Sequence, residues 1–228
     1  MDKSNLVTDV VLTANLNDLL QLDVDAVQAY ALVMRQLRSA ARKEAVRRYQ
    51  ADHKRHITEL KRLIRAYGGV PVAVSHVPTG PFKLAMQAAG SFGGDKAVLL
   101  AFKTNERQVR DKYRRAADGA GLPADVARVL KRAAADEERH YRWAEKSLER
   151  LGTGRRTKVG KVARAIEVAN ARTVDAVEAS EKPLMVVAEG ASRGARAATR
   201  RPLGKVALAA AVTGAAGAAI AMATRRMK

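Results

Sequence analysis

The 228-residue chain contains no cysteine. That absence excludes a disulfide framework, a thiolate zinc site, an iron–sulfur cluster and a cysteine nucleophile. Proline and aromatic residues are scarce as well, with six Pro, three Phe, five Tyr and one Trp. Proline lies mostly outside the long periodic segments, and their alanine-rich composition favours helix over strand. The sequence therefore predicts a nearly all-α protein.

Acidic residues are in short supply, with 23 Asp+Glu against 42 Lys+Arg and a net charge of +19. Residues 1–152 carry 27 basic and 18 acidic side chains, whereas residues 153–228 carry 15 and 5. The shorter C-terminal part is thus the more basic one. Such a surplus predicts an anionic partner, either a phospholipid headgroup layer or nucleic acid. The first ten residues do not resemble a secretory signal, so we expect the main domain to stay in the cytoplasm.

Four amphipathic segments dominate the first 152 residues. Apolar residues recur every three or four positions, which predicts helices over residues 15–38, 42–67, 95–118 and 123–152. Gly68 and Gly152 suit the C-terminal ends of the second and fourth helices, and Asp95 suits the N-terminal cap of the third. The sequence predicts a four-helix bundle built from two helical hairpins over residues 1–152.

A long connection separates the two predicted hairpins. Residues 70–94 contain three prolines, and one short helix is predicted within them, over residues 82–89. This connection is long enough to cross the bundle from one end to the other.

Ionisable residues interrupt each apolar stripe near its middle. The six residues are Asp23, His53, His56, Glu106, Glu137 and His140. An unpaired charge in a helix core costs several kcal/mol, so something must compensate for it. Carboxylates and imidazoles suit iron, manganese or zinc as ligands. The sequence therefore predicts a metal site, with iron as the first candidate and manganese as the alternative. The rival interpretation is a metal-free network of His, Tyr and carboxylate side chains.

The spacing of these residues supports a common level in the bundle. His53 and His56 are three residues apart, as are Glu137 and His140, so each pair lies on one helix face. With a rise of about 1.5 Å per residue, Asp23 and His56 lie at similar heights in the first hairpin. In the second hairpin the same count leaves a mismatch of roughly 4 to 9 Å.

The two hairpins also repeat each other in sequence. Asp23 precedes Tyr30 by seven residues, and Glu106 precedes Tyr113 by the same interval. The segment DHKRH at residues 52–56 recurs 84 residues later as DEERH. An internal duplication of this kind would bring the ionisable positions together about a pseudo-twofold axis.

In these residues the chain resembles the ferritin-like superfamily, nearer to its small stress-associated and rubrerythrin-type members than to cage ferritins. The resemblance covers about residues 12–151. In that superfamily two helices each give a Glu, and the other two each give a Glu-x-x-His pair, together binding two metal ions. The resemblance implies ligand positions for Asp23, Glu106, Glu137 with His140, and His56.

One position departs from the superfamily pattern. His53 stands where the second helix should give a Glu, so one of the two bridging carboxylates is missing. Asp52 is adjacent but points about 100° away on an ideal helix. The resemblance leaves open whether the site holds two metals asymmetrically, holds one, or is a relic.

The C-terminal part divides into a basic helical linker, residues 153–202, and an apolar end, residues 203–228. Residues 206–224 carry no charge, and nineteen such residues just span a bilayer core of about 30 Å. We expect a homo-oligomer with a tail anchor on the cytoplasmic side of the cell membrane, helped by anionic lipid. The alternatives are an Ala-rich helix buried in a homo-oligomer and an arm that binds nucleic acid nonspecifically.

These features predict a metal-binding protein in iron or oxidative-stress handling. If it is an enzyme, the expected chemistry is oxidation of iron(II) or reduction of peroxide. The rival from another class is a non-enzymatic structural or interaction protein with a degenerate metal site.

Overall fold

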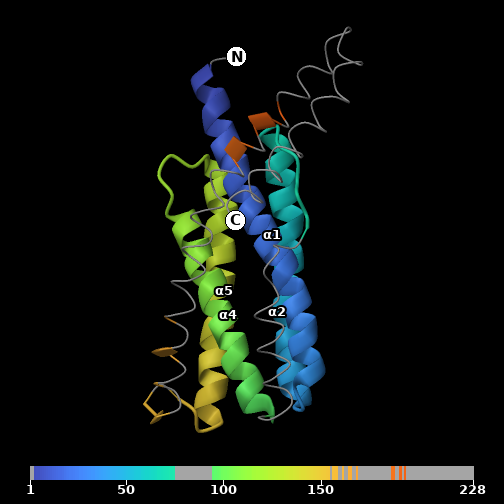
Figure 1. The fold of residues 1–228 in the computed structure, drawn as a ribbon, viewed down its shortest axis with the longest axis vertical. Helices are drawn as coiled ribbons and strands as arrows, with labels where there is room; N and C mark the ends of the chain where they lie inside the picture. Colours follow the sequence, from blue (N-terminus) through green and yellow to red (C-terminus); the bar gives the residue numbers. More distant parts are fainter. Residues whose placement is uncertain are drawn as a thin grey trace, which may run out of the picture.

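The computed structural model describes residues 3–74 and 94–154, together with isolated positions between 156 and 193. Within these residues the elements are four helices, α1 (Lys3–Gln36), α2 (Ala40–Ala66), α4 (Gly94–Ala117) and α5 (Ala124–Arg150). They confirm the predicted all-α bundle of two hairpins (Figure 1). The predicted short helix over residues 82–89, the apolar end of the chain and most of the basic linker lie outside the described residues.

The sequence prediction placed most helix ends within two residues, but the start of α1 was wrong. The helix begins at Lys3 rather than at residue 15. Its apolar stripe continues upstream, since Leu12 is buried and packs in the same cluster as Leu16.

A search of the described residues for a helix with the length and hydropathy of a membrane span finds none.

Glycine follows the C-terminal ends of α2 and α5, as the sequence predicted. Gly68 has a φ of +76° and Gly152 a φ of +72°, a left-handed conformation in which glycine avoids the strain of a side chain. After α2, the Gly68 N–H donates to the Arg65 carbonyl, and the Gly69 N–H donates to that of Ile64 at 2.8 Å. These bonds satisfy carbonyls that the helix end leaves open.

Contacts at the two ends of the bundle fix the direction of each helix. The Tyr67 hydroxyl donates to Asp125 at 2.7 Å, so the end of α2 lies beside the start of α5. At the opposite end, Asp95 at the start of α4 contacts the turn that joins α1 to α2. Each helix is therefore antiparallel to both of its neighbours in the ring α1–α2–α5–α4 (Figure 1).

Asp95 joins the two hairpins. We expected it to cap its own helix, but its carboxylate accepts hydrogen bonds from the backbone N–H groups of Arg38 (2.5 Å) and Ser39 (3.1 Å). The Arg42 guanidinium donates to the same carboxylate at 2.7 Å. Burial alone would raise the pKa of Asp95, but these hydrogen bonds lower it below its usual value.

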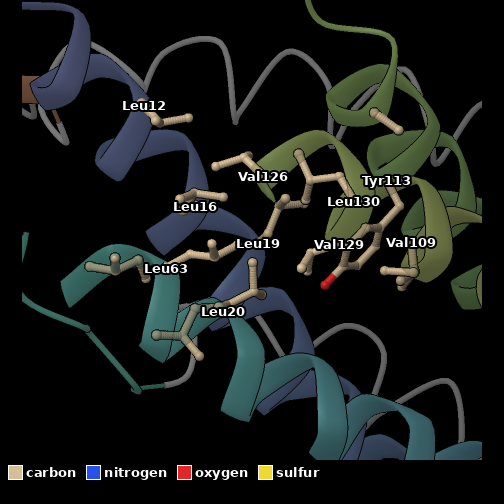
Figure 2. Packing of buried hydrophobic residues seen from close by; sticks show 14 residues of the cluster. Leu12, Leu16, Leu19, Leu20, Leu63, Val109, Tyr113, Val126, Val129 and Leu130 are labelled. Atoms are coloured by element: carbon tan, nitrogen blue, oxygen red, sulfur yellow. The ribbon is translucent and has the colours of Figure 1, made fainter. Parts of the chain in front are cut away.

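The core consists of two hydrophobic clusters, one toward each end of the bundle. The first is mainly aliphatic and draws Leu20 from α1, Leu63 from α2 and Leu130 from α5 (Figure 2). The second includes Tyr30 and Phe102, with Trp143 packed against it. Along every helix the ionisable positions lie between residues of the two clusters. The middle layer is thus closed above and below by apolar side chains.

Truncating the first cluster should weaken the whole fold. Leu63 is fully buried, so Leu63→Ala removes packing and leaves a cavity. We expect the free energy of unfolding to fall by about 2–5 kcal/mol. Urea denaturation followed by circular dichroism measures this loss, and the exposed neighbour Arg62 gives the control Arg62→Ala. A loss no larger than in the control would contradict the proposed core.

Candidate metal centre

All six predicted residues lie in the middle layer with at most 1% of their surface exposed. Asp23 comes from α1, His53 and His56 from α2, Glu106 from α4, and Glu137 and His140 from α5. Their oxygen and nitrogen atoms form two overlapping groups, each compact enough to hold a metal ion. We name them the Asp23 group (Asp23, His53, His56, Glu137) and the Glu106 group (His53, Glu106, Glu137, His140).

The Asp23 group links the first hairpin to α5. His53 Nδ1 lies 2.8 Å from Asp23 Oδ1 and 3.5 Å from Glu137 Oε1. His56 Nδ1 lies 3.6 Å and 3.5 Å from the same two oxygens. Two imidazole nitrogens and two carboxylate oxygens therefore face one another.

The Glu106 group is centred on α4 and α5. His140 Nδ1 lies 3.7 Å from Glu106 Oε2 and 3.4 Å from Glu137 Oε2. Glu137 thus directs one oxygen to each group. The sequence left a mismatch in height between the two helices of this hairpin, but in the structure Glu106 and His140 lie at the same level and contact each other.

Two tyrosines cross between the hairpins to hold the carboxylates. Tyr113 on α4 donates its hydroxyl to Asp23 Oδ2 at 2.5 Å, and Tyr30 on α1 donates to Glu106 Oε2 at 2.7 Å. Burial, followed by the nearby carboxylate charges, raises the pKa of both tyrosines well above the usual value. Both hydroxyls therefore keep their protons at neutral pH and act as donors.

Two aspartates outside the six predicted residues orient the histidines. His56 Nε2 lies 3.2 Å from Asp136 Oδ2, and His140 Nε2 lies 3.0 Å from Asp52 Oδ2. Each imidazole can thus donate Nε2–H to an aspartate on the opposite hairpin, so that Nδ1 is the nitrogen directed at the centre. Asp52 does not join either donor group.

Arginines complete this outer layer. Arg55 pairs with Asp52 at 2.8 Å and with Asp136 at 2.5 Å, and Arg139 pairs with the same two aspartates at 2.7 and 2.8 Å. Burial would raise the pKa of Asp136, but hydrogen bonds from His56 and Arg139 lower it to about 2. The repeated DxxRH pattern was the signal in the sequence for this layer. Its partners could not be deduced because each aspartate serves the histidine of the other helix.

Burial and neighbouring charges shift the pKa values of the carboxylates of the centre in different directions. Burial, and then the charge of Glu137, raise the pKa of Glu106 to about 8, and burial raises that of Glu137 to about 7. Burial would also raise the pKa of Asp23, but its hydrogen bond with His53 and the nearby His56 hold it below the usual value. Burial lowers the pKa of His56, yet its hydrogen bond to Asp136 and the nearby Asp23 raise it to about 10.

Several polar atoms in this layer make no hydrogen bond within the described part of the chain. They are Nε2 of His53, Nδ1 of His56, Oε1 of Glu106 and both carboxylate oxygens of Glu137. Such orphaned buried atoms are rare in folded proteins and call for an explanation. A cation would satisfy them, and the oxygen and imidazole donor set suits a divalent first-row metal. The residues present therefore fit a metal ion.

Comparison with known proteins adds one likeness. A family described as a domain of unknown function (DUF2383) matches residues 12–119. The match takes in most of α1 and all of α2 and α4, but it ends before α5, which gives Glu137 and His140. No curated protein and no solved structure matches the sequence.

The raised carboxyl pKa values predict how the metal-free protein responds to pH. Glu106 and Glu137, with pKa values of about 8 and 7, bind more protons in the folded than in the unfolded chain, where Glu titrates near 4.3. Stability should therefore fall as the pH rises from about 5 to 8. His56, with a pKa of about 10, extends the decline above pH 6.5.

Thermal unfolding in the presence of a chelator measures this trend. We expect the midpoint to decrease steadily between pH 5 and 9, and Glu106→Gln to make the decrease shallower. A midpoint that is constant or rises over this range would show that the carboxyls do not hold protons in the folded state.

Proposed function

We propose that this chain is a ferritin-like, non-haem metal-binding protein that acts in iron or oxidative-stress handling. The observation that carries the proposal is the buried layer of three carboxylates and three imidazoles with unpartnered atoms at its middle. The likeness to ferritin-like bundles in ligand positions and in the order of the hairpins supports it.

The donor set suits iron, manganese or zinc, and the proposed oxidative chemistry requires iron or manganese, because zinc is not redox-active. Hard cations such as Mg²⁺ and Ca²⁺ prefer oxygen ligands throughout, and Cu(I) prefers sulfur, whereas mixed imidazole and carboxylate donors suit iron, manganese and zinc. Bound iron or manganese would supply the electron-transfer chemistry for oxidation of iron(II) or reduction of peroxide.

The chain's own residues would prepare that layer. Asp52 and Asp136 accept the Nε2 protons of His140 and His56, which fixes the tautomers of the ligands. The two hydrophobic clusters exclude bulk water from both ends, and this strengthens every interaction between the charged groups.

The rival proposal is a non-enzymatic scaffold in which the same residues form a metal-free polar network. The close contacts of His53 with Asp23 and of Tyr30 with Glu106 favour it. It leaves both Glu137 oxygens without a hydrogen bond among the described residues, and for that reason we prefer the metal-binding proposal.

Elemental analysis separates the two proposals. Protein purified without added metal should carry about one or two iron or manganese atoms per chain, as in other bundles with such ligands. The double variant Glu106→Ala, Glu137→Ala should lose them. Glu44→Ala, Glu149→Ala removes two exposed carboxylates and should not. Wild-type protein without metal, or equal loss in both variants, would favour the scaffold.

We also propose, from sequence alone, that the C-terminal part attaches the bundle to an anionic membrane. The support is the basic linker followed by the uncharged residues 206–224. A homo-oligomer that buries the same residues and an arm for nucleic acid are the alternatives.

Fractionation of cells that express the full chain tests the attachment. We expect the chain to stay with membranes through a high-salt wash and to need detergent for release, because insertion does not depend on screened charges. Release by salt alone would indicate surface or nucleic-acid electrostatics, and recovery in the soluble fraction at low salt would exclude attachment.

A further inference from the structure

The Asp23 group contains a nearly complete four-donor position. Its donor atoms are Asp23 Oδ1, the Nδ1 atoms of His53 and His56, and Glu137 Oε1, at separations of 2.8, 3.5, 3.5 and 3.6 Å where nitrogen faces oxygen. Four donors around one cation at bond lengths of about 2.1 Å stand about 3.4 Å apart in a tetrahedron. Only small side-chain shifts separate this arrangement from a tetrahedral site.

Tyr113 leaves that position open. Its hydroxyl binds Asp23 Oδ2, whereas Oδ1 is the oxygen that faces His53 and His56. That hydrogen bond therefore orients the carboxylate and keeps Oδ1 inside the group, where Oδ1 pairs with another of the four donors, His53 Nδ1, at 2.8 Å.

The Glu106 group is closed at the equivalent place. Tyr30 donates to Glu106 Oε2, the oxygen that faces His140, and the same hydroxyl lies 3.3 Å from His140 Nδ1. Glu106 Oε2 is thus engaged by the Tyr30 proton, and the same hydroxyl lies against His140 Nδ1, the second atom that would bind a cation.

His53 also makes the Asp23 group and the Glu106 group differ. A Glu at this position could present one oxygen to each group, as Glu137 does. The imidazole instead directs Nδ1 toward Asp23 and Glu137 Oε1, so that nitrogen serves the Asp23 group.

We infer that the centre has two unequal cation positions: one in the Asp23 group, whose four donor atoms already face one another and which fills first, and a weaker one in the Glu106 group, which must displace the Tyr30 hydroxyl. This inference rests on the proposed metal-binding function. Pseudo-equivalent residues of the two hairpins, such as His56 and His140, then have different roles.

Titration of the chelator-treated full chain with Co²⁺ tests the inference. Equilibrium dialysis gives the stoichiometry, and visible absorption distinguishes four-coordinate Co²⁺, which absorbs strongly, from higher coordination. We expect one equivalent to bind at least tenfold more tightly than any second and to produce the strong bands.

The matched variants His56→Ala and His140→Ala assign the positions. His56→Ala should lose the tight equivalent, and His140→Ala should keep it and lose only the weak one. Two wild-type equivalents of equal affinity, the same loss in both variants, or loss of the tight equivalent in His140→Ala would overturn the inference.

A second matched pair of variants, with more conservative substitutions, covers the case in which the alanine variants fail to fold. Asp23→Asn and Glu106→Gln keep the shapes of the side chains and the tyrosine contacts, and circular dichroism verifies each fold. Asp23→Asn should weaken the first equivalent and Glu106→Gln only the second, and the reverse would again overturn the inference. A wild-type chain that binds no Co²⁺ would instead contradict the proposed metal-binding function itself.

Discussion

The cost of burying ionisable groups in the middle of a helical bundle governs this structure. Glu106 and Glu137 are fully buried, and their pKa values rise because their charged forms lose water and repel each other. Replacing such groups with apolar residues would be expected to stabilise an ordinary bundle. Their presence together at one level is best explained by a cation that pairs with them.

The surroundings of the centre follow from that constraint. Each hairpin supplies a tyrosine to a carboxylate of the other hairpin and an aspartate to a histidine of the other hairpin. These crossed bonds make the polar layer a joint between the hairpins as well as a candidate site. The apolar clusters pack on either side of the layer, whose six central side chains are at most 1% exposed.

The sequence predicted the parts of this arrangement that depend on one helix at a time. Interrupted apolar stripes indicated all six residues that the structure brings together, and Gly68 and Gly152 indicated where the second and fourth helices end. It did not predict that Asp95 binds the turn of the first hairpin or that Asp52 serves His140. Such pairings depend on how helices lie side by side, and spacing along a single helix carries no information about them. The early start of α1 was missed because its apolar stripe continues beyond the segment used for the prediction.

Anomalous X-ray diffraction from crystals of the full chain grown with Mn²⁺ or Co²⁺ would test the central claim most directly. We predict an anomalous peak within bonding distance of Glu137 and His56, inside the layer that the two hydrophobic clusters enclose. Peaks confined to surface carboxylates, with none among the six buried side chains, would contradict the account.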